Sequence, residues 1–271
     1  MSFEPVSPER YTEEYYLGSC GGIEFFRLYG PMVARPLQAY ALRRAGIFPG
    51  MRVLEVGCGR GELLYQAKER GAFAVGVDFS EAALRIASRD SQGTVARSDA
   101  KSLPFRDRSF DLVFFLGVLD HLHDWELEAC FREFKRVLKP GGSVLANTCA
   151  NRDYYKNRTY WLHRLLARLL GLKEPAQPRS SEDRVLHVNE HDGKGLSEFF
   201  QRIGWKAEIE PRPNDKYALL ELYGNPLPEN FPLKPAPPWK RWYLRLAFRG
   251  PLKRYLAREF FCELSPFPEG P

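Results

Sequence analysis

One stretch, residues 53 to 61 (VLEVGCGRG), constrains this chain more than any other. Val53, Leu54 and Val56 suit a strand that is covered on both faces of a parallel sheet. Three glycines then follow at alternate positions, and glycine lets the backbone turn sharply and approach a ligand closely. Residues 62 to 68 (ELLYQAK) have the composition of a helix. A strand, a glycine loop and a helix N-terminus in this order predict a nucleotide-type binding site.

The composition narrows the class of protein. A length of 271 residues with 44% hydrophobic content indicates one α/β domain with additions. No apolar run reaches about 18 residues, which argues against a transmembrane helix, and no signal peptide is evident. Five cysteines without a Cys-x-x-Cys pair indicate reduced thiols in a cytoplasmic protein. The net charge of +6 permits an anionic partner without naming one.

Strand and helix patterns alternate along the middle of the chain. Strands are predicted at 73–78, 94–100, 110–116 and 143–148, and helices at 36–45, 81–87, 125–138 and 195–203. Such alternation through short turns indicates a doubly wound, mostly parallel sheet. Segments 206–210 and 217–222 are joined by a loop too short for a crossover helix, so they are expected to pair antiparallel. The predicted fold is a seven-stranded α/β sheet with an antiparallel terminal strand.

Three segments lie outside this pattern. Residues 1–34, rich in aromatic side chains, form an N-terminal cap that either folds over a ligand or packs on the core as an arm. Residues 150–194 form an insertion whose helix at 161–170 has a leucine face. Core packing is its default interpretation, and a lid or a membrane-touching helix is the alternative.

The third of these segments, residues 224–271, is a proline-rich linker followed by a basic tail. Its span 239–258 carries seven basic side chains and no acid, which predicts a basic amphipathic helix broken at Gly250-Pro251. Such a helix contacts anionic lipid or nucleic acid, or it packs on the body through its aromatic side chains.

Five blocks of this sequence together resemble the class I S-adenosylmethionine-dependent methyltransferases of the small-molecule, type 11-like kind. The blocks are 53–61, 76–80 (GVDFS), 99–105, 110–113 (FDLV) and 136–142 (RVLKPGG), within a domain of about residues 35–223. The resemblance implies a Rossmann-like methyltransferase fold, S-adenosyl-L-methionine as cofactor and in-line methyl transfer. Nicotinamide dehydrogenases share a glycine loop, but theirs is Gly-x-Gly-x-x-Gly, whereas here the spacing is Gly-x-Gly-x-Gly with Glu55 two residues before it.

The resemblance also assigns residues to the cofactor. They are Glu55, Gly57, Cys58, Gly59, Gly61, Asp78, Phe79, Asp99, Ala100 and Leu116. Glu55 would hold the glycine loop or the cofactor ammonium. Asp78 lies about twenty residues past the loop, where a carboxylate takes the ribose hydroxyls, and Phe79 would pack on the adenine. Asp99 would accept from the adenine amino group, and Leu116 would line the sulfonium site.

The acceptor side is less defined by the sequence. His121, in a DHLH stretch after the fourth strand, is the candidate general base, or it caps or packs. Candidate acceptor contacts are Tyr15, Tyr16, His187 and His191. No metal site is predicted, because His121 and His123 have no third ligand at a helpful spacing.

Three functions fit these patterns. The first is a methyltransferase for a small molecule or a lipid- or carrier-linked metabolite, cytoplasmic, with the tail touching an anionic membrane surface as a further expectation. The second is an RNA methyltransferase that uses the basic tail on phosphates. The third is a non-catalytic, cofactor-binding partner protein. The sequence leaves the acceptor atom and the oligomeric state undetermined.

Overall fold

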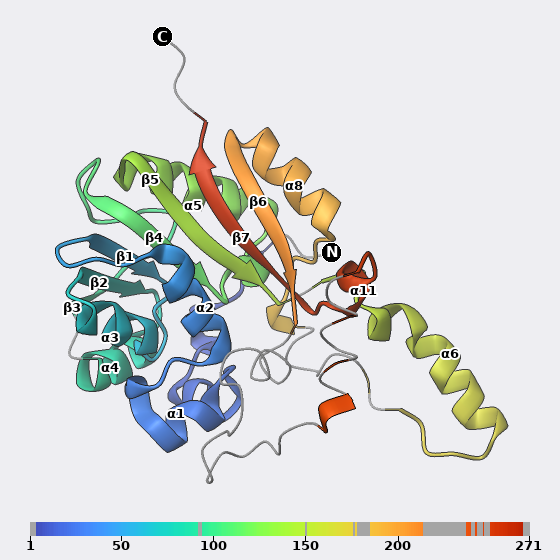
Figure 1. Ribbon diagram of the computed structural model, residues 1–271. Coiled ribbons are helices and arrows are strands. Elements are labelled where there is room, and N and C mark those ends of the chain that lie inside the picture. Colours follow the sequence, from blue (N-terminus) through green and yellow to red (C-terminus); the bar gives the residue numbers. More distant parts are fainter. Residues whose placement is uncertain are drawn as a thin grey trace.

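The body of the protein is a seven-stranded sheet with helices on its faces (Figure 1). The computed structural model describes residues 4–91, 94–149, 151–175, 177, 185–213, 237–239, 242, 246 and 250–267. The strand order is β3-β2-β1-β4-β5-β7-β6. The strands are β1 (Arg52–Val56), β2 (Phe73–Asp78), β3 (Thr94–Arg97), β4 (Phe110–Leu116), β5 (Leu138–Thr148), β6 (Trp205–Arg212) and β7 (Glu259–Pro266).

The first five strands are parallel to one another, and β7 is antiparallel to both of its neighbours, β5 and β6. This confirms the predicted fold class. Residues 139–142, which lie between the predicted helix and the predicted strand, belong to β5, and the strand pairing is irregular there, since Phe110 lies opposite Leu138 but Leu112 lies opposite Ser143.

The helices of the described part of the chain follow the predicted order. They are α1 (Ile23–Tyr29), α2 (Pro36–Ala45), α3 (Glu62–Glu69), α4 (Glu81–Asp90), α5 (Asp124–Val137), α6 (Tyr155–Leu169), α8 (Gly193–Arg202) and α11 (Lys253–Leu256), with a 3₁₀ turn at Leu119–His121. The hydroxyl of Ser80 accepts the N–H of Ala83 at 3.3 Å, so Ser80 caps α4. Pro36 opens α2, and Gly46 ends it with a φ of +54°.

Two hydrophobic layers cover the two faces of the sheet. Alternate residues of a strand point to opposite faces, so Val113 and Phe115 of β4 pack in one layer and Leu112 and Phe114 in the other. The first layer is filled by apolar side chains of α5 and α8, and the second by those of α2 and α3. The sheet is therefore buried on both faces, which is why its strands read as nearly continuous apolar runs.

The strand β7 corrects one expectation about the domain boundaries. It lies within residues 224–271, assigned from the sequence to a linker and a tail, yet it inserts between β5 and β6, so the sheet domain extends past residue 223. Phe260 and Cys262 are buried on one face of the sheet and Phe261 on the other, because β7 is an interior strand. The strand expected at 217–222 lies outside the described residues.

Helix α6 corrects a second expectation. It was expected to pack in the core, but it extends away from the sheet (Figure 1), and among its residues only Ala167 is buried. The side chains of Trp161 and Leu169 are 66% and 72% exposed. In the tail, Trp239 and Trp242 are also exposed, so these two rings do not pack on the body as one alternative required. Much of the remainder of the expected tail helix lies outside the described residues.

No helix among the described residues has both the length and the apolar character needed to cross a bilayer.

Candidate functional site

A cavity of about 700 Å³ lies at the carboxyl ends of β1, β2 and β4, and residues of the N-terminal segment cover it. Ligands of doubly wound sheets bind at this edge of the sheet. Most sequence-predicted site residues line this cavity, namely Glu55, Gly57, Cys58, Gly59, Asp78, Phe79, Asp99, Ala100, Leu116, His121, Tyr15, Tyr16 and His187. Gly61 and His191 do not line it.

The glycine loop needs glycine for its conformation and for space. Gly57, Gly59 and Gly61 have φ values of +73°, +51° and +79°, in the left-handed region that other residues avoid. A Cβ on Gly57 would lie 2.4 Å from Cγ2 of Val118, and one on Gly61 would lie 2.8 Å from Cβ of Ser91. Gly61 therefore serves the packing of the loop against α4, whereas Gly57 and Gly59 face the cavity.

Asp78, at the end of β2, is held by backbone donors. Its Oδ2 accepts the N–H of Gly59 at 3.0 Å, and its Oδ1 accepts the N–H of Ser80 at 2.9 Å. Burial raises the pKa of Asp78 to about 6, although these N–H groups act to lower it. Each carboxylate oxygen keeps a second lone pair for a ligand hydroxyl. The geometry thus fits the ribose-binding role expected for Asp78.

Glu55, at the end of β1, is a buried acid that needs a partner. Among the described residues, its Oε2 has no hydrogen-bond partner. Burial, and then the nearby charge of Glu62, raise the pKa of Glu55 well above its usual range. A ligand ammonium or another donor would satisfy this oxygen. Together with the glycine cradle, the orphaned oxygen fits the aminoacyl end of S-adenosylmethionine.

Arg60, which the sequence did not single out, ties the cap to the glycine loop. Its guanidinium is buried and donates to the carbonyl oxygens of Tyr16 at 2.9 Å and Gly21 at 2.8 Å. It also pairs with the buried carboxylate of Glu62 at 2.8 Å. A second tie joins the hydroxyl of Ser80 to the carbonyl of Tyr11 at 2.7 Å. The N-terminal segment is therefore both packed on the core and a wall of the cavity.

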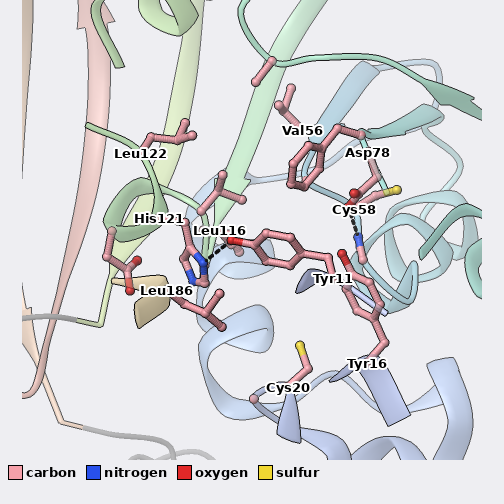
Figure 2. Close-up of a pocket in the computed structure, with 18 of the residues that line it drawn as sticks. Tyr11, Tyr16, Cys20, Val56, Cys58, Asp78, Leu116, His121, Leu122 and Leu186 are labelled. Carbon is pink, nitrogen blue, oxygen red and sulfur yellow. Dashed lines mark hydrogen bonds between the residues drawn. The ribbon is translucent and has the colours of Figure 1, made fainter. Parts of the chain in front are cut away.

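The opposite end of the cavity holds a polar cluster (Figure 2). The hydroxyl of Tyr11 lies 2.7 Å from Nδ1 of His121, as Figure 2 shows, and Oδ2 of Asp120 lies 3.1 Å from Nε2 of His187. The two imidazole rings are T-shaped, with centroids 4.9 Å apart. Oδ1 of Asp120 is buried without a hydrogen-bond partner in the described part of the chain.

The fold separates the other histidines from this cluster. His191 lies 3.4 Å from a carboxylate oxygen of Asp124, away from the cavity. Burial lowers the pKa of His191. His123 caps the start of α5, and its Nε2 lies 3.1 Å from the carbonyl oxygen of Glu4.

The expectation that His121 has no suitable further metal ligand is wrong, because the fold brings the side chains of Asp120 and His187 close to it. His187 is distant from His121 in sequence, so no local spacing could reveal this group. Tyr11, also missed, gives no signal beyond its place in an aromatic-rich segment.

Three expected cofactor contacts keep their roles as predictions. Asp99 lines the cavity, but its carboxylate also contacts Lys101, from Oδ2 to Nζ at 3.1 Å. Phe79 packs edge-on against the ring of Tyr11, with centroids 5.0 Å apart. Leu116 ends β4 and faces the region between Tyr11 and the sheet. Aromatic and acidic side chains therefore line this part of the cavity, and such a lining suits a cationic ligand.

The sequence of this domain is similar to known methyltransferases. The family model described as a methyltransferase domain matches residues 54–146. A sterol 24-C-methyltransferase of Gibberella zeae is 32% identical over 158 residues, covering 54% of this chain and 41% of that protein. A ubiquinone biosynthesis O-methyltransferase of Photorhabdus laumondii is 28% identical over 205 residues, covering 72% and 75%. A demethylmenaquinone methyltransferase of Corynebacterium glutamicum is 36% identical over 102 residues, covering 38% and 43%. The chain spans less than half the length of the sterol and menaquinone relatives.

Solved structures show the same fold. A chain from the Haloferax volcanii complex of the Trm112 methyltransferase activator with a putative methyltransferase matches with a TM-score of 0.57 at 17% identity, covering 94% of this chain and 97% of that one. A Thermotoga maritima S-adenosylmethionine-dependent methyltransferase, described as a possible histamine N-methyltransferase, matches with a TM-score of 0.54 at 18% identity, covering 95% and 99%. At these identities the likeness concerns the fold.

Proposed function

Since the chain belongs to the class I S-adenosylmethionine-dependent methyltransferases, we propose that it transfers a methyl group to a small molecule or to a lipid- or carrier-linked metabolite. One observation carries this proposal. The same cavity joins the glycine loop and Asp78 at one end to the Tyr11, Asp120, His121 and His187 cluster at the other. A methyl donor and an acceptor bound in it would lie side by side, as in-line displacement requires.

The bound cofactor supplies a methyl group that is already activated by the sulfonium. The chain's own residues then have three tasks. Asp78 and Glu55 bind and orient the cofactor, and the cap, fixed by Arg60, excludes water from the cavity. His121 accepts a proton when the acceptor hydroxyl or amine carries one, and the hydroxyl of Tyr11 keeps its imidazole ring in place.

A labelling experiment tests this function. The purified chain is incubated with methyl-labelled S-adenosylmethionine and fractionated cell extract. The Asp78→Asn variant, which lacks the carboxylate expected to bind the ribose hydroxyls, is the matched control. Label in a small-molecule or lipid fraction, reduced by the substitution, is the expected result. Label in RNA would overturn the proposal in favour of a nucleic-acid substrate. Cofactor binding without label in any fraction would indicate a non-catalytic binding protein.

We also propose that the acceptor is presented at an anionic membrane surface, and helix α6 supports this. Residues 155–173 carry five basic side chains and no acid, and three of the five pair with acids just outside the segment, Arg164 and Arg168 with Glu174 and Arg158 with Asp153. Trp161, Leu165 and Leu169 recur at spacings of four and are all exposed, so they form one apolar stripe. An amphipathic helix with an apolar stripe, a tryptophan and basic flanks is typical of elements that lie in the membrane interface. The exposed Trp239 and Trp242 add apolar surface from the basic tail.

Vesicle flotation tests the membrane proposal. The chain is expected to float with vesicles of phosphatidylglycerol and phosphatidylcholine, less with pure phosphatidylcholine, and less after Trp161→Ser and Leu165→Ser together. Phe48→Ser, which removes another exposed apolar side chain, is the matched control. Equal flotation of all three proteins, or none with anionic vesicles, would contradict a role for α6.

A further inference from the structure

We propose that Asp120, His121 and His187 form a binding site for a divalent transition metal at the acceptor end of the cavity. Each side chain offers one ligand atom, and the three atoms lie within 4.8 Å of one another. All three residues line the cavity. The existence of the site is independent of the proposed methyl transfer, whereas its role rests on that function.

The geometry is close to that of a bound metal. Ligand atoms on one tetrahedral zinc lie about 3.4 Å apart, given metal–nitrogen distances of about 2.0–2.1 Å. Oδ2 of Asp120 and Nε2 of His187 are already 3.1 Å apart. Since no pair exceeds 4.8 Å, small side-chain rotations would bring His121 onto the same ion.

A cation would also relieve an energetic cost. The side chain of Asp120 is 1% exposed, and its Oδ1 has no hydrogen-bond partner among the described residues. A buried carboxylate oxygen without a donor is costly, and such groups are usually paired or bound to metal. Asp120 lines the cavity, so an ion bound by both oxygens of its carboxylate would satisfy Oδ1 as well as contact Oδ2.

The set of donors suits a catalytic type of metal site. Two imidazoles and one carboxylate leave a zinc-like ion with an open fourth position, because such ions prefer four ligands. A hydroxyl on a ring nitrogen, as Tyr11 provides for His121, is the kind of outer contact that orients metal-binding imidazoles. The open position would take an oxygen of the acceptor, which keeps a second lone pair for the methyl group. In the metal-bound state His121 is a ligand and not the proton acceptor, and the ion would instead lower the pKa of the coordinated hydroxyl so that its proton leaves to solvent.

Cobalt titration tests the site directly. The tag-free full chain is dialysed against EDTA and titrated with Co²⁺, with visible absorption as the readout and Zn²⁺ as competitor. One equivalent of Co²⁺ is expected to bind and to be displaced by Zn²⁺. Asp120→Asn and His187→Gln should each weaken binding at least about tenfold. His191→Gln is the matched control, because His191 also contacts an aspartate but lies outside the cavity.

Two further measurements separate the possible failures. Circular dichroism and S-adenosylmethionine binding by each variant show whether it is folded. Absence of stoichiometric Co²⁺ binding by the parent chain, or equal binding by folded Asp120→Asn and His187→Gln, would overturn the metal site and leave a hydrogen-bonded Asp–His pair. Methyl transfer that persists after EDTA treatment would remove the metal's role in the reaction. Stoichiometric Co²⁺ binding in a chain without methyl transfer would support the site and contradict only the proposed function.

Discussion

Gly57→Ala is the substitution whose consequence the structure defines most closely. Gly57 has a φ of +73°, and the left-handed region costs a residue with a Cβ roughly 1–2 kcal/mol. The new Cβ would also lie 2.4 Å from Cγ2 of Val118, so Val118 must move. Overpacking of this kind costs typically about 1–3 kcal/mol. We therefore expect the free energy of unfolding to fall by about 2–5 kcal/mol.

Two companion variants separate these contributions. Gly204→Ala measures the backbone cost alone, because Gly204 has a φ of +82° and open space around its Cβ position. Its loss should stay within about 1–2 kcal/mol. Val118→Ala removes the methyl groups that clash. The double variant of Gly57→Ala and Val118→Ala should be less destabilised than the sum of the two single variants by about 1–3 kcal/mol.

Urea denaturation without cofactor gives the free energy of unfolding of the parent chain and of the four variants. An unchanged m-value shows that only stability has changed. Strict additivity in the cycle would refute the claim that Val118 occupies the space above the loop. Equal losses in Gly57→Ala and Gly204→Ala would refute it as well. In either case the requirement for glycine at position 57 would be conformational alone.

Two further predictions concern charge. Burial raises the pKa of Asp78 to about 6, and ribose hydroxyls bind its ionised form. Cofactor affinity should therefore fall as the pH drops below 6, by up to about tenfold per pH unit. Calorimetry should show that this pH dependence is lost in Asp78→Asn. A slope unchanged in Asp78→Asn would assign the titration elsewhere. Arg60→Met leaves the buried carboxylate of Glu62 unpaired, so urea denaturation should show a loss of about 3–5 kcal/mol. Arg85→Met breaks an exposed pair and should cost about 0–1 kcal/mol, and equal losses would show that the Arg60 pair gains nothing from burial.

Local sequence patterns were enough to predict the parallel part of the sheet and the glycine-loop end of the cavity. Strand β1 and the glycine loop are adjacent in sequence, and both have strong local preferences. The carboxyl ends of parallel strands share one edge of the sheet, so Asp78 could be placed beside the loop from strand order alone. Helix α2 begins at a proline and ends at a glycine, and helix α4 begins after a serine cap, and these signals act within a few residues.

The acceptor end had no comparable local signal. Tyr11 and His121 are 110 residues apart in the sequence, and their contact arises only when the cap folds over the sheet. His187 reaches Asp120 from the far side of the insertion. Strand β7 begins at Glu259, far along the chain from the end of β6 at Arg212, so its pairing with β5 and β6 depends on a long-range closure that no local pattern marks.

The sequence by itself therefore determined the fold class, the resemblance to methyltransferases and the cofactor that this resemblance implies, because these depend on short-range preferences and on strand order. The tertiary structure decided which strand lies between β5 and β6, which face of α6 stays exposed, and which polar groups meet at the end of the cavity away from the glycine loop. The physical reason is that burial and long-range contacts depend on the whole fold, and residues such as Asp120 gain a neighbour like His187 only once the chain has closed around them.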